Sequence, residues 1–374
     1  MNILMVNLPY AGHTNPTLPL VSELTRRGHQ VTYVNAENFR HRIEAAGAAF
    51  VPYKGFPDSL SEKDIKRKSF RAAFDTVQSL PDTYDMLIYE MFFYPGIEIA
   101  NRRRIPCVRQ FSQPAWSRNT WKNAPAAFRI SAKLIDLQIL KKQDARRMGF
   151  AASSLRDGIL QSRPDLNIVY VPEQFQNCRD SFGDSYLFML PPPISTVSAI
   201  RVPYGEMKKP IVYISLGSII SNRGFCKECI RAFGGKPLSV ILNTGRIPPE
   251  TLGTIPENIR AYSFVPQIEV LKHADVFLTH CGMNSVNEAL YTGVPMVAMP
   301  FINDQITNAR RVVELGLGKR VRSFPSRGKE LYQAVWDVYT DAQIKRNAEA
   351  MSTAVRQQAD WDSVISRIEQ LQAR

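Results

Sequence analysis

The sequence is poor in cysteine and has no long hydrophobic run. Its five cysteines are an odd number at irregular spacing in 374 residues, which argues against a disulfide framework and for a reducing compartment. Cys226 and Cys229 form a C-x-x-C, but without a second pair this spacing is weak evidence for zinc or redox chemistry. No apolar stretch approaches the roughly 18 residues of a membrane span, and the N-terminus does not resemble a signal peptide. We therefore expect a cytoplasmic protein.

Acidic residues are scarce relative to basic ones, and the formal net charge is +13. Residues 101–150 hold twelve Lys or Arg against two Asp. Such a block can face nucleic acid, an anionic membrane surface or an acidic acceptor, although a solvated helix face is commoner. Ile130, Leu134, Leu137 and Leu140 interleave with it at near-helical spacing, and we expect this stripe to be core. No nucleic-acid motif accompanies the block, so we expect no nucleic-acid partner and leave the inner membrane surface open.

Short apolar strands alternate with helical segments in both halves of the chain, which predicts α/β architecture with parallel sheets. Three prolines at 191–193 interrupt the alternation, because they continue neither a helix nor a central strand. We expect domains at 1–190 and 211–374, joined by a linker at 191–210. The predicted strands are Ile3–Leu8, Gln30–Asn35, Ala49–Pro52, Met86–Tyr89, Cys107–Arg109, Ile168–Val171, Ile211–Leu216, Ser239–Asn243, Ala261–Phe264, Val276–Thr279 and Met296–Ala298.

The segment from Phe264 to Ala309 carries the clearest chemical pattern. An apolar strand ends at Thr279, and helical spacing begins at Met283. The free N–H groups and the positive dipole end at such a point attract an anion, and Gly282 lets the backbone approach a phosphate closely. A diphosphate fits this description. Polar side chains that could hold the rest of a nucleotide sugar follow at His280, Asn284, Ser285, Glu288, Asp304 and Gln305.

Each of these residues also has a plain structural interpretation. His280 alone would be a hydrogen-bonded loop histidine, Asn284-Ser285 would be a helix N-cap, and Glu288 would complement the helix dipole. Their joint occurrence in one short segment favours the ligand-binding interpretation.

The ordered strings F-V-P-Q, H-C-G-M-N-S-x2-E and D-Q-x2-N-A closely resemble the donor-binding signature of family 1 glycosyltransferases. This resemblance implies a GT-B fold, in which two Rossmann-like domains face each other across a cleft, and a final helix, roughly Asp341–Gln372, that returns to the N-terminal domain. It also implies that Phe264 stacks on the base and that the Val265 backbone and Gln267 read the base or ribose. Asp304 and Gln305 would hold the transferred hexose. Bacterial macrolide-modifying members look most similar, through the string Arg310–Gly318.

A second polar turn follows the first strand, at Gly12-His13-Thr14-Asn15-Pro16. It resembles the family's G-H-x-N-P turn, whose histidine is the general base, a role suited to imidazole at neutral pH. The base needs a carboxylate to fix its tautomer, and the family usually supplies aspartate. Here Glu90 stands at that position. Asp85 is the nearest alternative but precedes its strand.

The resemblance implies an inverting displacement: His13 deprotonates an acceptor hydroxyl, and the diphosphate leaves toward the helix dipole, His280 and Ser218. We expect a UDP-sugar donor, with glucose as the sugar by family habit, a small hydrophobic acceptor, and neither cofactor nor metal. Two alternatives stay open. One is a glycolipid glycosyltransferase that uses the basic block on a membrane surface, and the other is a nucleotide-sugar-binding partner protein without catalysis.

Overall fold

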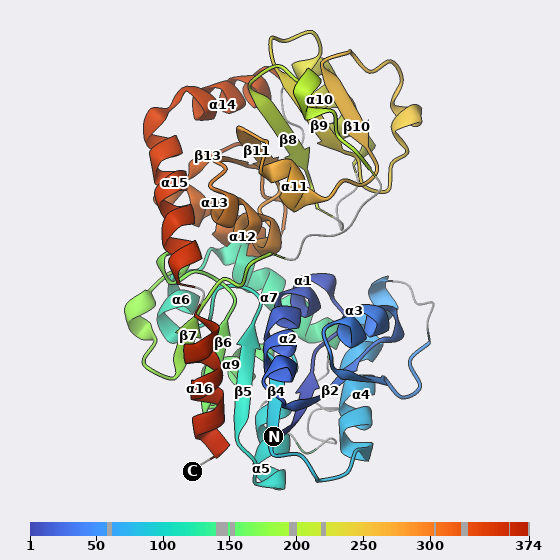
Figure 1. Ribbon diagram of the computed structural model, residues 1–374, viewed down its shortest axis with the longest axis vertical. Helices are drawn as coiled ribbons and strands as arrows, with labels where there is room; N and C mark the ends of the chain where they lie inside the picture. The colour runs from blue at the N-terminus through green and yellow to red at the C-terminus, as the bar shows by residue number, and fades with distance from the viewer. Residues whose placement is uncertain are drawn as a thin grey trace. The chain divides into compact units, whose positions relative to one another are not determined.

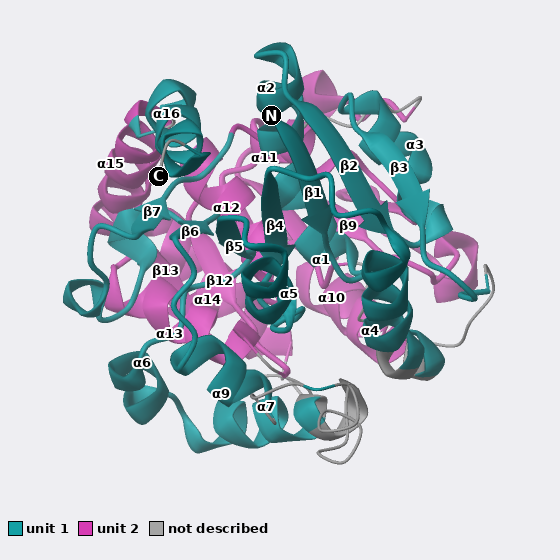
Figure 2. Ribbon diagram, turned by 90° about the horizontal axis from the view of Figure 1, so that it is seen from below, with its two compact units in different colours: residues 1–191, 358–374 teal, residues 192–357 magenta. Residues whose placement is uncertain are grey.

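A computed structural model describes residues 1–57, 62–139, 149, 154–193, 200–217, 222–302, 304–322, 328–358 and 360–372. The chain falls into two compact units, coloured separately in Figure 2. The first comprises Met1–Pro191 and Gln358–Arg374, and the second comprises Pro192–Gln357. Relative to the predicted domains, this division assigns the end of the chain to the first unit.

The first unit is built on a parallel β-sheet (Figure 1), whose described strands follow the order β3-β2-β1-β4-β5-β6-β7 (Figure 2). The strands are β1 (Asn2–Val6), β2 (Gln30–Asn35), β3 (Ala49–Pro52), β4 (Met86–Glu90), β5 (Cys107–Phe111), β6 (Leu166–Val169) and β7 (Tyr186–Phe188). The helices are α1 (Ala11–Thr14), α2 (Leu18–Arg26), α3 (Arg40–Ala45), α4 (Glu62–Ser79), α5 (Gly96–Arg103), α6 (Arg118–Asn123), α7 (Ala126–Ile139), α9 (Leu155–Leu160) and α16 (Trp361–Gln372). The strand order reverses between β1 and β4, and open α/β sheets bind ligands at the carboxyl ends of strands beside such a reversal.

One face of this sheet packs against α2, α3 and α16. Alternate residues of β1, Ile3 and Met5, enter a buried cluster with Val21 of α2, Ile43 of α3 and Ile365 of α16. Strand side chains alternate between faces, so the intervening residues of each strand point to the opposite side of the sheet.

Arg109 is buried on that opposite face, where neutral groups accept its hydrogen bonds. Its Nε donates to Asn167 Oδ1 at 2.9 Å, and one terminal nitrogen donates to the Ile159 carbonyl at 3.0 Å and to Ser162 Oγ at 2.8 Å. The guanidinium therefore ties β5 to β6 and α9. Although Arg109 belongs to the basic block in sequence, it adds nothing to an exposed basic surface.

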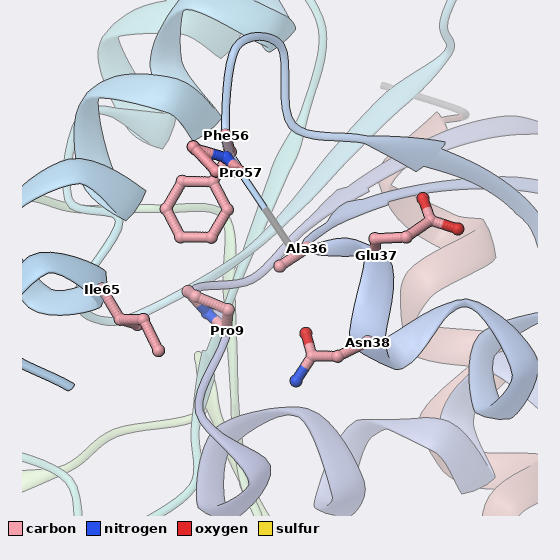
Figure 3. A pocket seen from close by; sticks show the side chains of 7 residues that line it. All are labelled: Pro9, Ala36, Glu37, Asn38, Phe56, Pro57 and Ile65. Atoms are coloured by element: carbon pink, nitrogen blue, oxygen red, sulfur yellow. The ribbon is translucent and has the colours of Figure 1, made fainter. Parts of the chain in front are cut away.

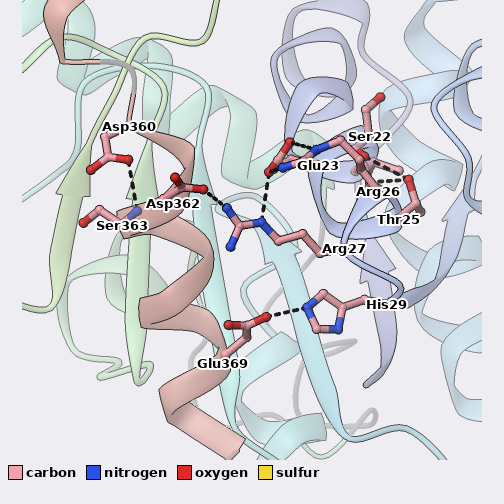
Figure 4. A network of polar contacts seen from close by, with 11 residues as sticks. Ser22, Glu23, Thr25, Arg26, Arg27, His29, Asp360, Asp362, Ser363 and Glu369 are labelled. Carbon is pink, nitrogen blue, oxygen red and sulfur yellow. Dashed lines mark hydrogen bonds and ion pairs between the residues drawn. The ribbon is translucent and has the colours of Figure 1, made fainter.

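The end of the chain forms two helices, where we predicted one from Asp341 to Gln372. The helix α15 (Ala342–Gln357) belongs to the second unit, and α16 belongs to the first. Figure 4 shows how α16 is held against α2: Arg27 bridges Glu23 and Asp362, and His29 Nε2 lies 3.0 Å from Glu369 Oε1. Charged pairs thus supplement the apolar contacts of α16.

The second unit repeats the same topology. Its described strands follow the order β10-β9-β8-β11-β12-β13, all parallel, with the reversal between β8 and β11. The strands are β8 (Ile211–Ser215), β9 (Ser239–Asn243), β10 (Ile259–Tyr262), β11 (Val276–Thr279), β12 (Met296–Ala298) and β13 (Gly318–Arg320). The helices are α10 (Arg223–Phe233), α11 (Gln267–Leu271), α12 (Met283–Thr292), α13 (Asp304–Glu314), α14 (Gly328–Thr340) and α15. Both units are therefore Rossmann-like, as the sequence predicted.

The apolar stripe in the basic block is not core where the structure describes it. Ile130 and Leu134 lie one turn apart on α7 and are 58% and 53% exposed, so the prediction is wrong for these two residues. The side chain of Leu137 and all of Leu140 lie outside the described residues. Among the described residues, no helix is both long and apolar enough to cross a membrane.

Candidate functional site

His13 and Glu90 meet at the strand-order reversal of the first unit. His13 lies on α1, just after β1, and Glu90 is the last residue of β4. His13 Nδ1 is 2.9 Å from Glu90 Oε2. A carboxylate only accepts, so this contact places the histidine proton on Nδ1 and leaves the Nε2 lone pair available as a base. The His13 side chain is 18% exposed whereas that of Glu90 is 3% exposed, so a ligand can reach the histidine but not its partner.

The backbone around His13 is held by buried polar groups that we did not predict. Asn7, directly after β1, donates through Nδ2 to the His13 carbonyl at 3.1 Å, and Tyr53 donates to the Asn7 carbonyl. Asn35 donates to Thr14 Oγ1 at 3.0 Å. The polar residues at the ends of β1 and β2 were the available sequence signal. They fix the loop that presents the histidine.

The alternative carboxylate Asp85 lies at the other end of β4. Its Oδ2 accepts from the Asn2 backbone N–H at 2.6 Å, at the amino end of β1. The histidine follows the carboxyl end of β1, so Asp85 is excluded as its partner.

A small pocket lies beside the strand end that leads to His13 (Figure 3). It has a volume of about 80 Å³. Most of its lining is apolar, and the polar residues Glu37 and Asn38 follow β2. The lining residues are Pro9, Ala36, Glu37, Asn38, Phe56, Pro57 and Ile65.

In the second unit, His280 follows β11 and its ring is enclosed by two glycines. A Cβ on Gly217 would lie 2.6 Å from His280 Cε1, and one on Gly282 would lie 2.5 Å from Nε2. The predicted reason for Gly282 was close approach to a phosphate, and the structure adds that this position must make room for the imidazole. His280 Nδ1 is buried and meets no hydrogen-bond partner in the described part of the chain.

Burial lowers the pKa of His280 to about 4. The ring is therefore neutral at pH 7 and can offer a hydrogen bond to an anion without adding positive charge. The first turn of α12 supplies the dipole instead. Its N-cap residue is Gly282, with no side-chain capping bond, so the interpretation of Asn284-Ser285 as a plain N-cap is wrong.

Glu288 is held on α12 by Gln267 at the start of α11. Gln267 Nε2 donates to Glu288 Oε2 at 2.7 Å and to Ser285 Oγ at 3.2 Å, while Tyr213 donates to Gln267 Oε1 at 3.2 Å. Both ends of the Gln267 amide are thus bonded to protein groups, whereas we predicted that it reads a base or ribose. Burial raises the pKa of Glu288 to about 6, against the opposing effect of the Gln267 hydrogen bond.

Asp304 and Gln305 begin α13 beyond the carboxyl end of β12. Gln305 Oε1 accepts from the backbone N–H groups of Phe301 at 2.9 Å and Ile302 at 3.2 Å. Asn308 donates to Asp304 Oδ2 at 3.1 Å and to the Cys281 carbonyl at 3.0 Å. The two predicted sugar-binding residues are therefore fixed in the loop network that also contains the residue after His280.

Phe264 lies in the loop after β10, two residues beyond the strand that we predicted would contain it. Its side chain is 53% exposed, whereas Val265 is buried. An exposed ring at the carboxyl end of a strand can stack on a planar ligand. Asn284 is half-buried on the first turn of α12. Ser218 lies outside the described residues.

No cluster of three or more His, Cys, Asp or Glu side chains with metal-ligand placement occurs in the residues that the structure describes. One Asp-x-Asp triplet occurs in sequence, at Asp360–Asp362, but Asp360 accepts from the Ser363 N–H and Asp362 pairs with Arg27. Cys226 and Cys229 are free and buried on α10, and burial raises the thiol pKa of Cys226 to about 11. A reactive thiol needs the opposite shift.

Comparison with known proteins identifies relatives along the whole chain. The family model described as UDP-glucoronosyl and UDP-glucosyl transferase matches residues 196–360. The demethyllactenocin mycarosyltransferase of Streptomyces fradiae is 30% identical, over 93% of this chain and 82% of its own. The NDP-glycosyltransferase YjiC of Bacillus subtilis is 29% identical, over 98% and 96%. The crystal structure of the glycotransferase of kitacinnamycin superposes with a TM-score of 0.83 at 26% identity, over 99% and 98%.

Proposed function

Because this chain belongs to the UDP-glucoronosyl and UDP-glucosyl transferase family of glycosyltransferases, we propose that it moves glucose from UDP-glucose to a hydroxyl of a small hydrophobic acceptor. The observation that carries this proposal is the hydrogen-bonded pair of His13 and Glu90 at the strand-order reversal of the first unit. A partly exposed base held by a buried carboxylate is suited to removing a hydroxyl proton.

The reaction is a single displacement with inversion at the anomeric carbon. His13 Nε2 takes the proton of the acceptor hydroxyl, whose oxygen attacks the anomeric carbon as the bond to the diphosphate breaks. Glu90 stabilises the imidazolium that forms on His13. Neutral His280 and the N-terminus of α12 stabilise the negative charge that develops on the leaving diphosphate, and Ser218 is a further predicted hydrogen-bond donor.

The donor is held by groups of the second unit. Phe264 stacks on the base, and Glu288, oriented by Gln267, accepts from the ribose hydroxyls. Asp304 and Gln305 bind the hexose. Protein donors serve the diphosphate in this mechanism, and we propose no cofactor or metal ion.

The acceptor class rests on the relatives and on the pocket of the first unit. One relative is named as a demethyllactenocin mycarosyltransferase and another as an oleandomycin glycosyltransferase of Streptomyces antibioticus. The pocket near Pro9 offers Phe56 and Ile65 to an apolar group. Its volume of about 80 Å³ admits a small substituent, since a cavity of roughly 10–15 Å³ by the same measure holds one water.

The test is acceptor-dependent nucleotide release. Purified protein is incubated with UDP-glucose or dTDP-glucose and a panel of phenolic and macrolide acceptors, and the freed diphosphate and the glycosylated product are both measured. We expect UDP release that requires an acceptor and product of matching amount. Donor binding without turnover on any acceptor would favour a binding partner protein, and absence of donor binding would contradict the assignment of the second unit.

A membrane-surface glycolipid transferase is the second candidate, and the exposed face of α7 favours it. Ile130 and Leu134 are exposed there beside the exposed cations Arg129 and Lys133. An amphipathic basic helix binds anionic lipid through both components. Sedimentation with liposomes, prepared with and without anionic lipid, tests this candidate, and the double variant Ile130→Gln, Leu134→Gln is the control. If the wild type stays in the supernatant with both kinds of liposome, the candidate is excluded.

A further inference from the structure

Three neighbouring strands of the first unit end in a row of buried polar side chains on one face of the sheet. Glu90 and Gln110 are register partners on β4 and β5. Asn7 extends β1 by one residue, since its N–H donates to the Val34 carbonyl, and by the register of β1 and β4 it lies next to Glu90. All three side chains are buried.

Each of these residues has one polar atom bonded and one without a partner in the described part of the chain. The unpartnered atoms are Asn7 Oδ1, Glu90 Oε1 and Gln110 Nε2. Two are acceptors, and the third, on Gln110, is a donor. A buried carboxylate oxygen without a hydrogen bond is costly. Asn7 Nδ2 already donates to the His13 carbonyl, so Gln110 Nε2 is the donor atom of the row that has no partner and could satisfy Glu90.

The hydrogen bond that Gln110 accepts leaves its amide nitrogen available for this contact. Tyr170 donates to Gln110 Oε1, which leaves Nε2 as the free end. Burial raises the pKa of Tyr170 well above its usual value, so the phenol remains a donor. A flipped amide would set an oxygen toward Glu90, and two acceptors repel. Adjacent strands lie about 4.8 Å apart, and the terminal torsions of Gln and Glu are broad, so small rotations join the two atoms.

We propose that Gln110 is a positioning residue for the acid–base pair, with its Nε2 donating to Glu90 Oε1. The resulting chain runs from Tyr170 through Gln110 and Glu90 to His13, and each bond polarises the next. Gln110 keeps the Glu90 carboxylate turned toward His13 Nδ1. The effect of Gln110 on sugar transfer rests on the proposed function. The hydrogen bond between Gln110 and Glu90 does not depend on it.

The other groups that face Glu90 do not replace this donor. His13 already uses Oε2. Tyr33 and Tyr53 are close enough to Glu90 to interact electrostatically, but Tyr33 is hydrogen-bonded to Thr17 and Tyr53 donates to the Asn7 carbonyl. Burial raises the pKa of both phenols, so neither adds a charge near neutral pH.

The experiment measures the titration of His13 by NMR in the free protein, which needs no substrate. The His13 signal is assigned by its loss in His13→Gln. In Gln110→Leu, the Glu90 carboxylate has lost its second hydrogen-bond donor, so it should stabilise the protonated imidazole of His13 more strongly. We expect the His13 midpoint to rise by about one pH unit. In Tyr170→Phe, which frees the amide to rotate, we expect a smaller rise in the same direction.

Activity provides the second readout. If the protein transfers sugar, Gln110→Leu should lower kcat by roughly tenfold, move the acidic limb of the pH profile upward with the NMR midpoint, and leave donor KM unchanged. A folded Gln110→Leu protein with an unmoved His13 midpoint overturns the proposal, even if its stability is lower. If Gln110→Leu does not fold, an unmoved midpoint in Tyr170→Phe overturns it. Loss of the proposed function alone would leave the NMR result intact.

Discussion

Replacement of Glu90 by aspartate, the residue that resemblance leads one to expect there, should impair this protein. Glu90 Oε2 lies 2.9 Å from His13 Nδ1. Removing one methylene withdraws the carboxylate by roughly 1.5 Å, which opens the contact to about 4.4 Å, beyond hydrogen-bond range. Loss of a hydrogen bond to a charged group costs about 1.5–3 kcal/mol. If the loss falls on the transition state, kcat declines by roughly 10- to 150-fold.

Glu90→Gln provides the matched comparison, because it keeps the length and removes the charge. The amide can donate to His13 Nδ1, which favours the tautomer with the proton on Nε2 and disables the base. We expect a larger loss than for aspartate, of about 10³- to 10⁴-fold, as for neutral replacements of a triad carboxylate.

The assay is steady-state transfer with the best acceptor of the panel, together with thermal unfolding and donor titration of each variant. Donor affinity should not change, because the donor-binding groups belong to the second unit. An aspartate variant with the wild-type kcat would refute the reasoning, since it would show that the length of Glu90 does not set the contact.

Other predictions concern the donor groups and the interior of the first unit. Burial raises the pKa of Glu288 to about 6, so the carboxylate that we propose accepts from ribose hydroxyls is lost as pH falls through that value. Calorimetry should show donor affinity declining from pH 7 to 5, and Glu288→Gln should bind donor more weakly with no such decline. Gly217→Ala places a Cβ 2.6 Å from His280 Cε1 at a φ of +74°, and it should weaken donor binding at least tenfold by displacing the ring. Gly235→Ala is the control, because Gly235 has a φ of +68° and no atom within 4 Å of the added Cβ. This variant carries the same backbone strain and should bind donor normally. Arg109→Met leaves several buried acceptors unpaired and should lower the free energy of unfolding of the first unit by about 3–5 kcal/mol, measured by urea unfolding. A variant as stable as the wild type would contradict this expectation.

The sheets were predictable because their strands are short apolar runs separated by helical segments. Val276–Thr279 and Ser239–Asn243 have the predicted bounds. Tyr186–Phe188 and Gly318–Arg320 were not predicted. Met296–Ala298 is equally short but was predicted because all three of its residues are apolar, whereas Gly318–Arg320 carries two cations. The break between α15 and α16 was missed because the helical pattern of the last residues is nearly continuous in sequence.

The sequence predicts which residues compose the candidate site but not the contacts that they make. Polar residues after strands indicated His13 and His280, because parallel strands bring their carboxyl ends to one edge of each sheet. The family resemblance indicated Glu90, which ends β4. The partners of Gln267 and Gln305 depend on which loops lie beside them, and nothing local in sequence reports that. The neutrality of His280 follows from burial between Gly217 and Gly282, which is a tertiary property.

The most direct test of the central claim compares single-turnover transfer by the wild type and by His13→Ala, each saturated with donor. The claim is that His13, held by Glu90, removes the acceptor proton. It predicts equal donor affinity and a transfer rate at least 10³-fold lower in the variant, in line with general-base catalysis of roughly 10²–10⁴-fold. A His13→Ala protein that transfers sugar within tenfold of the wild-type rate would contradict it.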